Sequence, residues 1–171
     1  MAGDFKASFR YYGEANALFR ALKDTFGVAY SYCGIANSMR MNGDFRGSLR
    51  FFTKARENYK RIGDKVSYAY TLWGEGTALQ MLGRNREALK DFEEARSLFR
   101  ETKDRRGLIY CLISIGELDF KKDPKKGMRA FSTASEARSP QPQVEARYAK
   151  SLIRPEGRAG AIPSILRRRW T

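Results

Sequence analysis

Histidine is absent from this 171-residue chain, and cysteine occurs only twice. The lack of histidine excludes imidazole general bases, histidine zinc ligands and every Ser-His or Cys-His catalytic pair. Cys33 and Cys111 do not form a CxxC pair, so we interpret them as packed, reduced thiols, with a disulfide or a metal role as the alternative. We therefore expect neither a metal site nor a cofactor.

Long apolar runs are absent as well. No stretch of eighteen apolar residues occurs, which argues against a membrane-spanning helix. The first ten residues, MAGDFKASFR, lack the apolar segment of a secretory signal. These two absences favour a cytoplasmic protein.

Acidic residues are few compared with basic ones. The chain has 19 Asp and Glu against 33 Lys and Arg, a formal net charge of +14, which favours acidic partners. The length suits one domain, and an apolar content of 42% is enough for a packed core.

What the chain does have is a repeat of forty residues. Three segments that begin at Gly3, Gly43 and Gly83 align without a gap, and a weaker fourth begins at Asp123 if one loop residue is dropped. The four copies are GDFKASFRYYGEANALF, GDFRGSLRFFTKARENY, GRNREALKDFEEARSLF and DPKKGMRAFSTASEAR. A fixed period in this range predicts a solenoid, in which each unit buries its apolar face only by stacking on its neighbours.

Both halves of the unit have helical spacing. Leu49, Phe52 and Ala55, like their equivalents in the other units, follow steps of three and four residues and therefore share one helix face. The expected helices cover about residues 4–22, 25–41, 44–62, 65–82, 85–102, 105–121 and 124–138. We call the helices at 25–41, 65–82 and 105–121 first-type helices and the others second-type helices. No useful length of chain shows strand-type alternation, so the pattern predicts an all-α fold.

The expected helix ends carry capping residues. An aspartate precedes each first-type helix, where its carboxylate accepts hydrogen bonds from free amides. These residues are Asp24, Asp64 and Asp104. Gly43 and Gly83 stand where a first-type helix ends.

The spacing of glycine, aromatic, small and alanine residues resembles the second helix of a tetratricopeptide repeat. The matching residues are Gly43, Phe45, Ser48, Phe52 and Ala55, and then Gly83, Ala88, Phe92 and Ala95. The first-helix signature is similar in Leu72 and Gly76, and in Leu112, Ile115 and Gly116. The forty-residue period is similar to that of the longer-helix subgroup. The resemblance covers about residues 3–138 and implies a right-handed α-solenoid of antiparallel helix pairs with about three and a half repeats.

The ends of the chain differ from this pattern. The first expected helix is of the second type, and no first-type helix precedes it. Residues 139–171 form a basic segment, for which we expect one short helix followed by disorder, ending in Arg167, Arg168, Arg169 and Trp170. A regulatory domain cut from a larger enzyme or transcription factor is one interpretation of such a chain.

No catalytic motif is present. Gly74, Glu75 and Gly76 begin like a dinucleotide-binding fingerprint, but Leu79 occupies the third glycine position, so helix packing explains these glycines better. Glu93 and Glu94 are adjacent on a helix, and their side chains therefore diverge. We expect that the protein is not an enzyme.

The family resemblance implies a candidate peptide site. In tetratricopeptide proteins the first-type helices line a concave face, which binds partner peptides. The positions that map to it are Tyr30, Tyr70 and Tyr110; Cys33, Trp73 and Ile113; Asn37, Thr77 and Glu117; and Arg40, Gln80 and Phe120. Asn37 falls where family members hold a ligand's backbone, whereas Cys33 replaces the lysine of the family's carboxylate clamp. The resemblance implies a non-catalytic module or scaffold for protein interactions. The alternative is that these aromatic residues only fill space between helices.

A basic stripe follows the second-type helices. Two positions four residues apart are basic in every unit, and this spacing places each pair on one helix face. The stripe consists of Lys6, Arg10, Arg46, Arg50, Arg86, Lys90, Lys125 and Arg129. Descent from one duplicated unit explains it without a function, and the alternative is binding to nucleic acid, an acidic protein or an anionic membrane surface.

The first expected helix has aromatic residues on more than one face. Only one face can be covered by the next helix, so the other, which includes Tyr11 and Leu18, is predicted to be exposed. We expect self-association there, most simply as a two-fold dimer.

Overall fold

A computed structural model describes residues 5–138, and within that range the chain forms only helices joined by short turns. The seven helices are α1 (Phe5–Ala21), α2 (Thr25–Met41), α3 (Phe45–Ile62), α4 (Lys65–Met81), α5 (Asn85–Glu101), α6 (Arg105–Phe120) and α7 (Pro124–Arg138). The all-α prediction is confirmed for this range, with each helix boundary within one or two residues of expectation. The expected short helix after residue 138 and the basic end lie outside the described residues.

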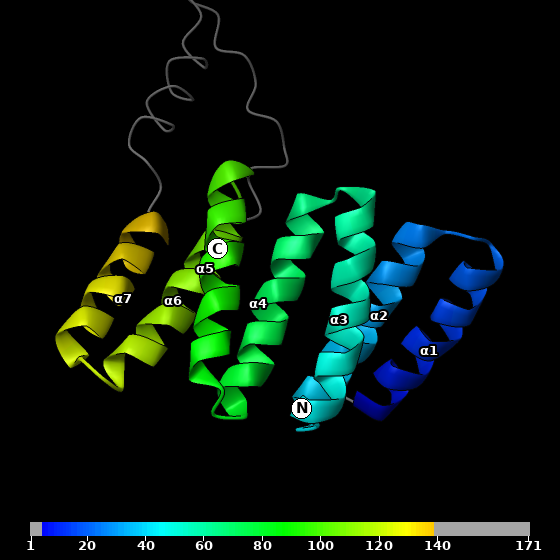
Figure 1. Ribbon diagram of the computed structural model, residues 1–171, viewed down its shortest axis with the longest axis horizontal. Coiled ribbons are helices and arrows are strands. Elements are labelled where there is room, and N and C mark those ends of the chain that lie inside the picture. Colours follow the sequence, from blue (N-terminus) through cyan, green and yellow to red (C-terminus); the bar gives the residue numbers. More distant parts are fainter. Residues whose placement is uncertain (1–4, 139–171) are drawn as a thin grey trace, which may run out of the picture. The chain divides into compact units, whose positions relative to one another are not determined.

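Each helix packs against its neighbours in the chain, so the helices follow one another in a row (Figure 1). Contacts beyond chain neighbours are confined to the first-type helices, because α4 contacts both α2 and α6. No two second-type helices bring their backbones as close together within residues 5–138. The first-type helices are therefore the more closely spaced row, and we call the surface formed by α2, α4 and α6 the inner face.

The predicted helix caps are confirmed. The carboxylates of Asp24, Asp64 and Asp104 each accept a hydrogen bond from the backbone amide three residues later, at 2.9–3.0 Å. Gly43 and Gly83 have φ of +86° and +75°, a left-handed conformation that costs glycine little. The carboxylates of Asp44 and Asp123 cap α3 and α7 in the same way, whereas Arg84 precedes α5 and provides no side-chain cap.

The core repeats one device along the row: an aromatic ring of a second-type helix lies against a glycine of a first-type helix. Phe52 is fully buried against Gly74, and Phe92 is fully buried against Gly76. A methyl group on either glycine would come within 2.7 Å of the ring, so glycine permits the close approach. The helix-packing interpretation of Gly74 and Gly76 is thereby confirmed.

Both cysteines are free thiols in the helical core. Cys111 is fully buried, and Cys33 is half-buried. Burial raises the pKa of Cys111 to about 12 and also raises that of Cys33, so both thiols are poor nucleophiles. Within residues 5–138 no helix has the length and apolarity to cross a membrane.

Candidate interaction surface

The three tyrosines at equivalent positions of the repeat lie one on each helix of the inner face. Tyr30 and Tyr110 are 52% and 38% exposed, so each presents a ring to solvent. Tyr70 lies deeper, with its ring edge against Phe99 at 4.7 Å between centroids. The Arg106 guanidinium donates a hydrogen bond to the Tyr70 hydroxyl at 3.3 Å, and burial raises the pKa of that tyrosine.

Trp73 connects the three first-type helices. Its indole stacks on Tyr110 of α6 at 5.1 Å between centroids, and its Nε1 donates to Ser114 Oγ at 3.1 Å. On the other side, the Arg40 guanidinium of α2 lies 6.0 Å from the ring centroid. Trp73 is half-buried and packs against the core, so it has a structural role in addition to any contact with a partner.

The polar side chains of the inner face are partly engaged with one another. The Asn37 amide donates to the carbonyl of Cys33 at 3.0 Å and accepts from Arg40 Nη2 at 3.2 Å. The Thr77 hydroxyl donates to the carbonyl of Trp73 at 2.9 Å. Gln80 and Glu117 form a further bridge between α4 and α6 at 3.3 Å.

Arg40 is the most unusual polar residue of this face. Its Nε is buried and makes no hydrogen bond, and burial lowers the pKa of its guanidinium. It contacts Asn37 and the Trp73 ring, and neither group carries a charge.

Large apolar side chains extend the exposed part of the first-type helices beyond the positions predicted from sequence. Ile113 and Phe120, both predicted, are 39% and 45% exposed. The full set on these helices is Phe26, Tyr30, Met41, Val66, Met81, Tyr110, Ile113 and Phe120. Phe26 and Val66 occupy one position of the forty-residue unit, and the same alignment that found the tyrosines could have found them.

The basic stripe lies at the surface as the register predicts. All eight of its residues are exposed. Arg10 forms an ion pair with Glu14 at 3.8 Å, the one acidic pairing that the structure records for the stripe between residues 5 and 138. The face of α1 predicted to be uncovered is also exposed: Tyr11 is 60%, Leu18 is 66% and Leu22, just after the helix, is 75% exposed.

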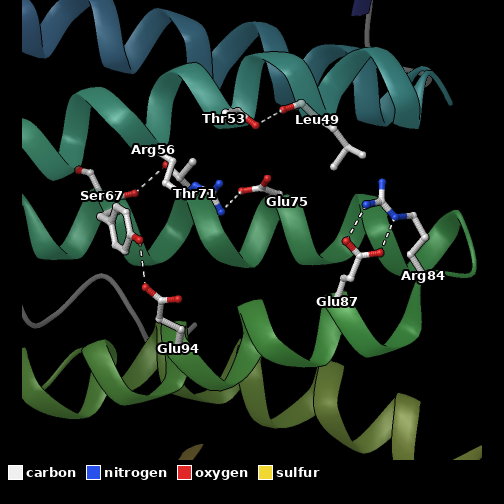
Figure 2. A network of polar contacts seen from close by, with 10 residues as sticks. Leu49, Thr53, Arg56, Ser67, Thr71, Glu75, Arg84, Glu87 and Glu94 are labelled. Carbon is white, nitrogen blue, oxygen red and sulfur yellow. Dashed lines mark hydrogen bonds and ion pairs between the residues drawn. The ribbon is translucent and has the colours of Figure 1, made fainter.

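A polar cluster between α3, α4 and α5 was not predicted from sequence. Figure 2 shows Glu75 of α4 directed toward Arg56 of α3, with Nη1 and Oε2 3.1 Å apart. Glu75 is only 7% exposed, and burial raises its pKa to about 7, although Arg56 acts in the opposite direction. Asp91 of α5 is 9% exposed, and burial raises its pKa to about 6.

The cluster surrounds a cavity of about 370 Å³. Its lining residues are Leu49, Thr53, Arg56, Glu75, Leu79, Arg84, Glu87, Lys90 and Asp91. The Arg84 guanidinium makes a two-pronged ion pair with Glu87, at 2.6 and 2.7 Å (Figure 2). The sequence signal for this cluster was available, because Glu75 stands where the other units have Ile35 and Ile115.

Comparison of the sequence with protein-family models and with curated proteins gives no match.

Proposed function

We propose that residues 5–138 form a right-handed, tetratricopeptide-like solenoid that acts as a non-catalytic interaction module and binds a peptide or partner protein on its inner face. The observation that supports this proposal most strongly is the gathering of exposed aromatic and aliphatic side chains on three adjacent first-type helices. Tyr30, Tyr110 and Ile113 supply contact area there at little cost in side-chain entropy.

The polar groups of the same face supply specificity. Arg40 offers a guanidinium whose charge is not neutralised by any carboxylate in the described part of the chain, and Arg106 lies over the Tyr70 ring at 5.8 Å. A partner segment that combines apolar side chains with a carboxylate matches this surface, since charge complementarity favours the correct partner and accelerates association.

The inner-face proposal is tested with peptides selected from a random display library on the full chain, and with affinities measured by fluorescence polarisation. Ile113→Glu and Tyr30→Ala should each weaken binding at least about tenfold, as truncations at binding hot spots do. Ile62→Ala is the matched control, because Ile62 is 40% exposed on a second-type helix. Unchanged affinity in both inner-face variants would refute the site.

A second candidate function is favoured by the exposed basic stripe. Eight exposed cations with a single recorded acidic partner are suited to a phosphate backbone. If the stripe binds duplex nucleic acid, log K should change by about 0.9 per phosphate neutralised as log salt changes. Reversal of Arg46, Arg50, Arg86 and Lys90 to Glu should abolish retardation of labelled DNA or RNA, and no retardation of the unaltered chain at low salt would retire this candidate.

The exposed face of α1 supports a further proposal, self-association as a two-fold dimer. Tyr11 and Leu18 share this face and are more than half exposed. Sedimentation should show a dimer for the unaltered chain and a helical monomer for Tyr11→Glu with Leu18→Glu. A monomer at high micromolar concentration before any substitution would contradict the dimer.

A further inference from the structure

Three residues of α4, α5 and the turn between them depart from the repeat pattern. Glu75 stands where the units on either side have a buried isoleucine, Ile35 and Ile115. Asp91 stands where the other units have Tyr11, Phe51 and Ala130. Arg84 replaces the aspartate that caps the second-type helices α3 and α7. Glu75 and Asp91 thus place carboxylates where the other units have none, and Arg84 leaves α5 without a side-chain cap.

These departures meet in one place. Although they are separated along the chain, Glu75, Arg84 and Asp91 all line the same cavity of about 370 Å³. Glu75 lies two residues after Trp73 on α4, about 200° around the helix, so the cavity opens away from the inner face. The exchanges therefore create one polar space between α3, α4 and α5 rather than three separate defects.

The chemistry of the cavity favours a ligand that donates hydrogen bonds. Asp91 is nine-tenths buried, and its Oδ2 makes no hydrogen bond. Glu75 Oε2 is close to Arg56 but does not have the geometry of a hydrogen bond. Burying a carboxylate without such partners is costly, and an N–H donor in the cavity would offset that cost.

The other groups that line the cavity limit which class of hydrogen-bond-donating ligand can bind there. The charge of Arg84 at the edge of the cavity is already neutralised by Glu87, and Arg56 forms its ion pair with Glu75 while it acts on Asp91 only electrostatically. No group of three metal-ligating side chains occurs among the described residues, which argues against a divalent cation. Leu49 and Leu79 add apolar wall.

We propose that this cavity is a binding site for a primary aliphatic ammonium group, held by the carboxylates of Asp91 and Glu75, with its carbon chain against Leu49 and Leu79. A free small amine and a lysine side chain of a partner share this chemistry. The site is separate from the inner face and does not depend on the proposed peptide binding.

Binding at this site is coupled to proton release, because only the ionised carboxylates accept the ligand's three N–H bonds well. The charged groups that act on the pair are Arg56 from α3 and Arg84, Glu87, Lys90 and Glu94 from the α5 region. With a pKa of about 7, Glu75 is about one-tenth ionised at pH 6 and about nine-tenths ionised at pH 8. Apparent affinity should therefore rise at least about tenfold between these pH values.

The test is an NMR titration of the full chain with n-butylammonium chloride at pH 8. The resonances of backbone amides around residues 75 and 91 should shift and saturate as the ligand is added. The affinity derived from these shifts should be about tenfold lower at pH 6. Tetramethylammonium chloride at equal ionic strength is the ligand control, because it carries the charge without an N–H donor. Equal shifts with both salts, or no saturable shift with butylammonium, would overturn the proposal.

Matched variants locate the effect. Asp91→Asn preserves shape and should abolish saturable binding, as should Glu75→Ile with Asp91→Ala, which restores residues of the neighbouring units. Glu57→Gln, an exposed carboxylate of α3, should leave binding unchanged. Saturable binding that persists in Asp91→Asn would also overturn the proposal.

A second arm distinguishes the sources of the amine. The peptide Gly-Gly-Lys-Gly-Gly, with both ends blocked, presents the same ammonium on a chain too bulky to enter whole. Binding of both probes supports a lysine side chain as the natural occupant, and binding of butylammonium alone supports a small free amine.

Discussion

The layer formed by α4 and α5 carries a carboxyl group at a buried position where the layer formed by α2 and α3 has an apolar side chain. Ile35 in α2 is 5% exposed, and Glu75 at the same place in α4 is 7% exposed. The two layers bury this position equally well, yet one fills it with an apolar side chain and the other with a carboxylate. The fold therefore accommodates a carboxyl group at a position that the neighbouring layer fills with isoleucine.

What the two layers share explains this tolerance. In each of them a fully buried phenylalanine lies against a glycine of α4: Phe52 against Gly74 in one, and Phe92 against Gly76 in the other. Because these rings fix the spacing of the helices on both sides of Glu75, the polar cluster does not have to hold the layers together.

The largest expected effect comes from removing the shared contact. Phe52→Ala and Phe92→Ala should each lower the free energy of unfolding by about 3–5 kcal/mol, since each leaves a cavity that the helices cannot close. Urea unfolding followed by circular dichroism measures this. Phe120→Ala, at a site 45% exposed, is the control and should cost far less. A loss below that of the control in either core variant would show that the rings do not fix the layers.

Replacing the buried carboxylates of α4 and α5 by apolar residues should increase the free energy of unfolding, by less than the core substitutions lower it. Glu75→Ile with Asp91→Ala should raise the free energy of unfolding by up to about 3 kcal/mol at pH 8. The reason is that burial moves the pKa of Glu75 from 4.5 to about 7, so the native state disfavours the charged form.

The pH dependence sharpens the same comparison. Between pH 4.5 and pH 7 the native state binds more protons at Glu75 than the unfolded chain does, so the stability of the unaltered protein should fall as pH rises through this window. Asp91, with a pKa of about 6, acts in the same direction. The double variant should lack this fall. If the free energy of unfolding of the unaltered protein is the same at pH 5 and at pH 8, as is expected for the double variant, the carboxylates are not held in a desolvated state.

The smallest effect concerns the cap of α5. Arg84→Asp gives α5 the residue type that caps α3, and it should stabilise the protein by about 0.5–1 kcal/mol, because a carboxylate accepts hydrogen bonds from the free amides of the first turn. The lost ion pair with Glu87 counts for little, since both side chains are about half exposed. Asp44→Ala should cost about 1 kcal/mol in the thermal or urea unfolding of the same chain. A destabilised Arg84→Asp would mean that the Arg84–Glu87 pair outweighs the cap.

The sequence predicted the regular parts of this protein well. The forty-residue register located seven helices, and the caps at Asp24, Asp64 and Asp104 followed from their position alone. The same register placed Tyr30, Tyr70 and Tyr110 in one row and Trp73 in the next row with Cys33 and Ile113, because equivalent residues of successive units are expected to stack. It could not show that Trp73 is half-buried or that Arg40 lacks a counter-ion, since both depend on side-chain conformations across helices.

The sequence by itself determined the all-helical fold of residues 5–138, the order of the two helix types and the positions of the basic stripe. These features are periodic, and a periodic pattern can be recognised in the sequence without knowledge of interatomic distances. The family resemblance had already implied that the first-type helices form the inner row, and only the tertiary structure brought Glu75, Arg84 and Asp91 to one cavity. These three residues occupy unrelated positions of the repeat unit. They line one cavity because of the way in which α3, α4 and α5 pack together.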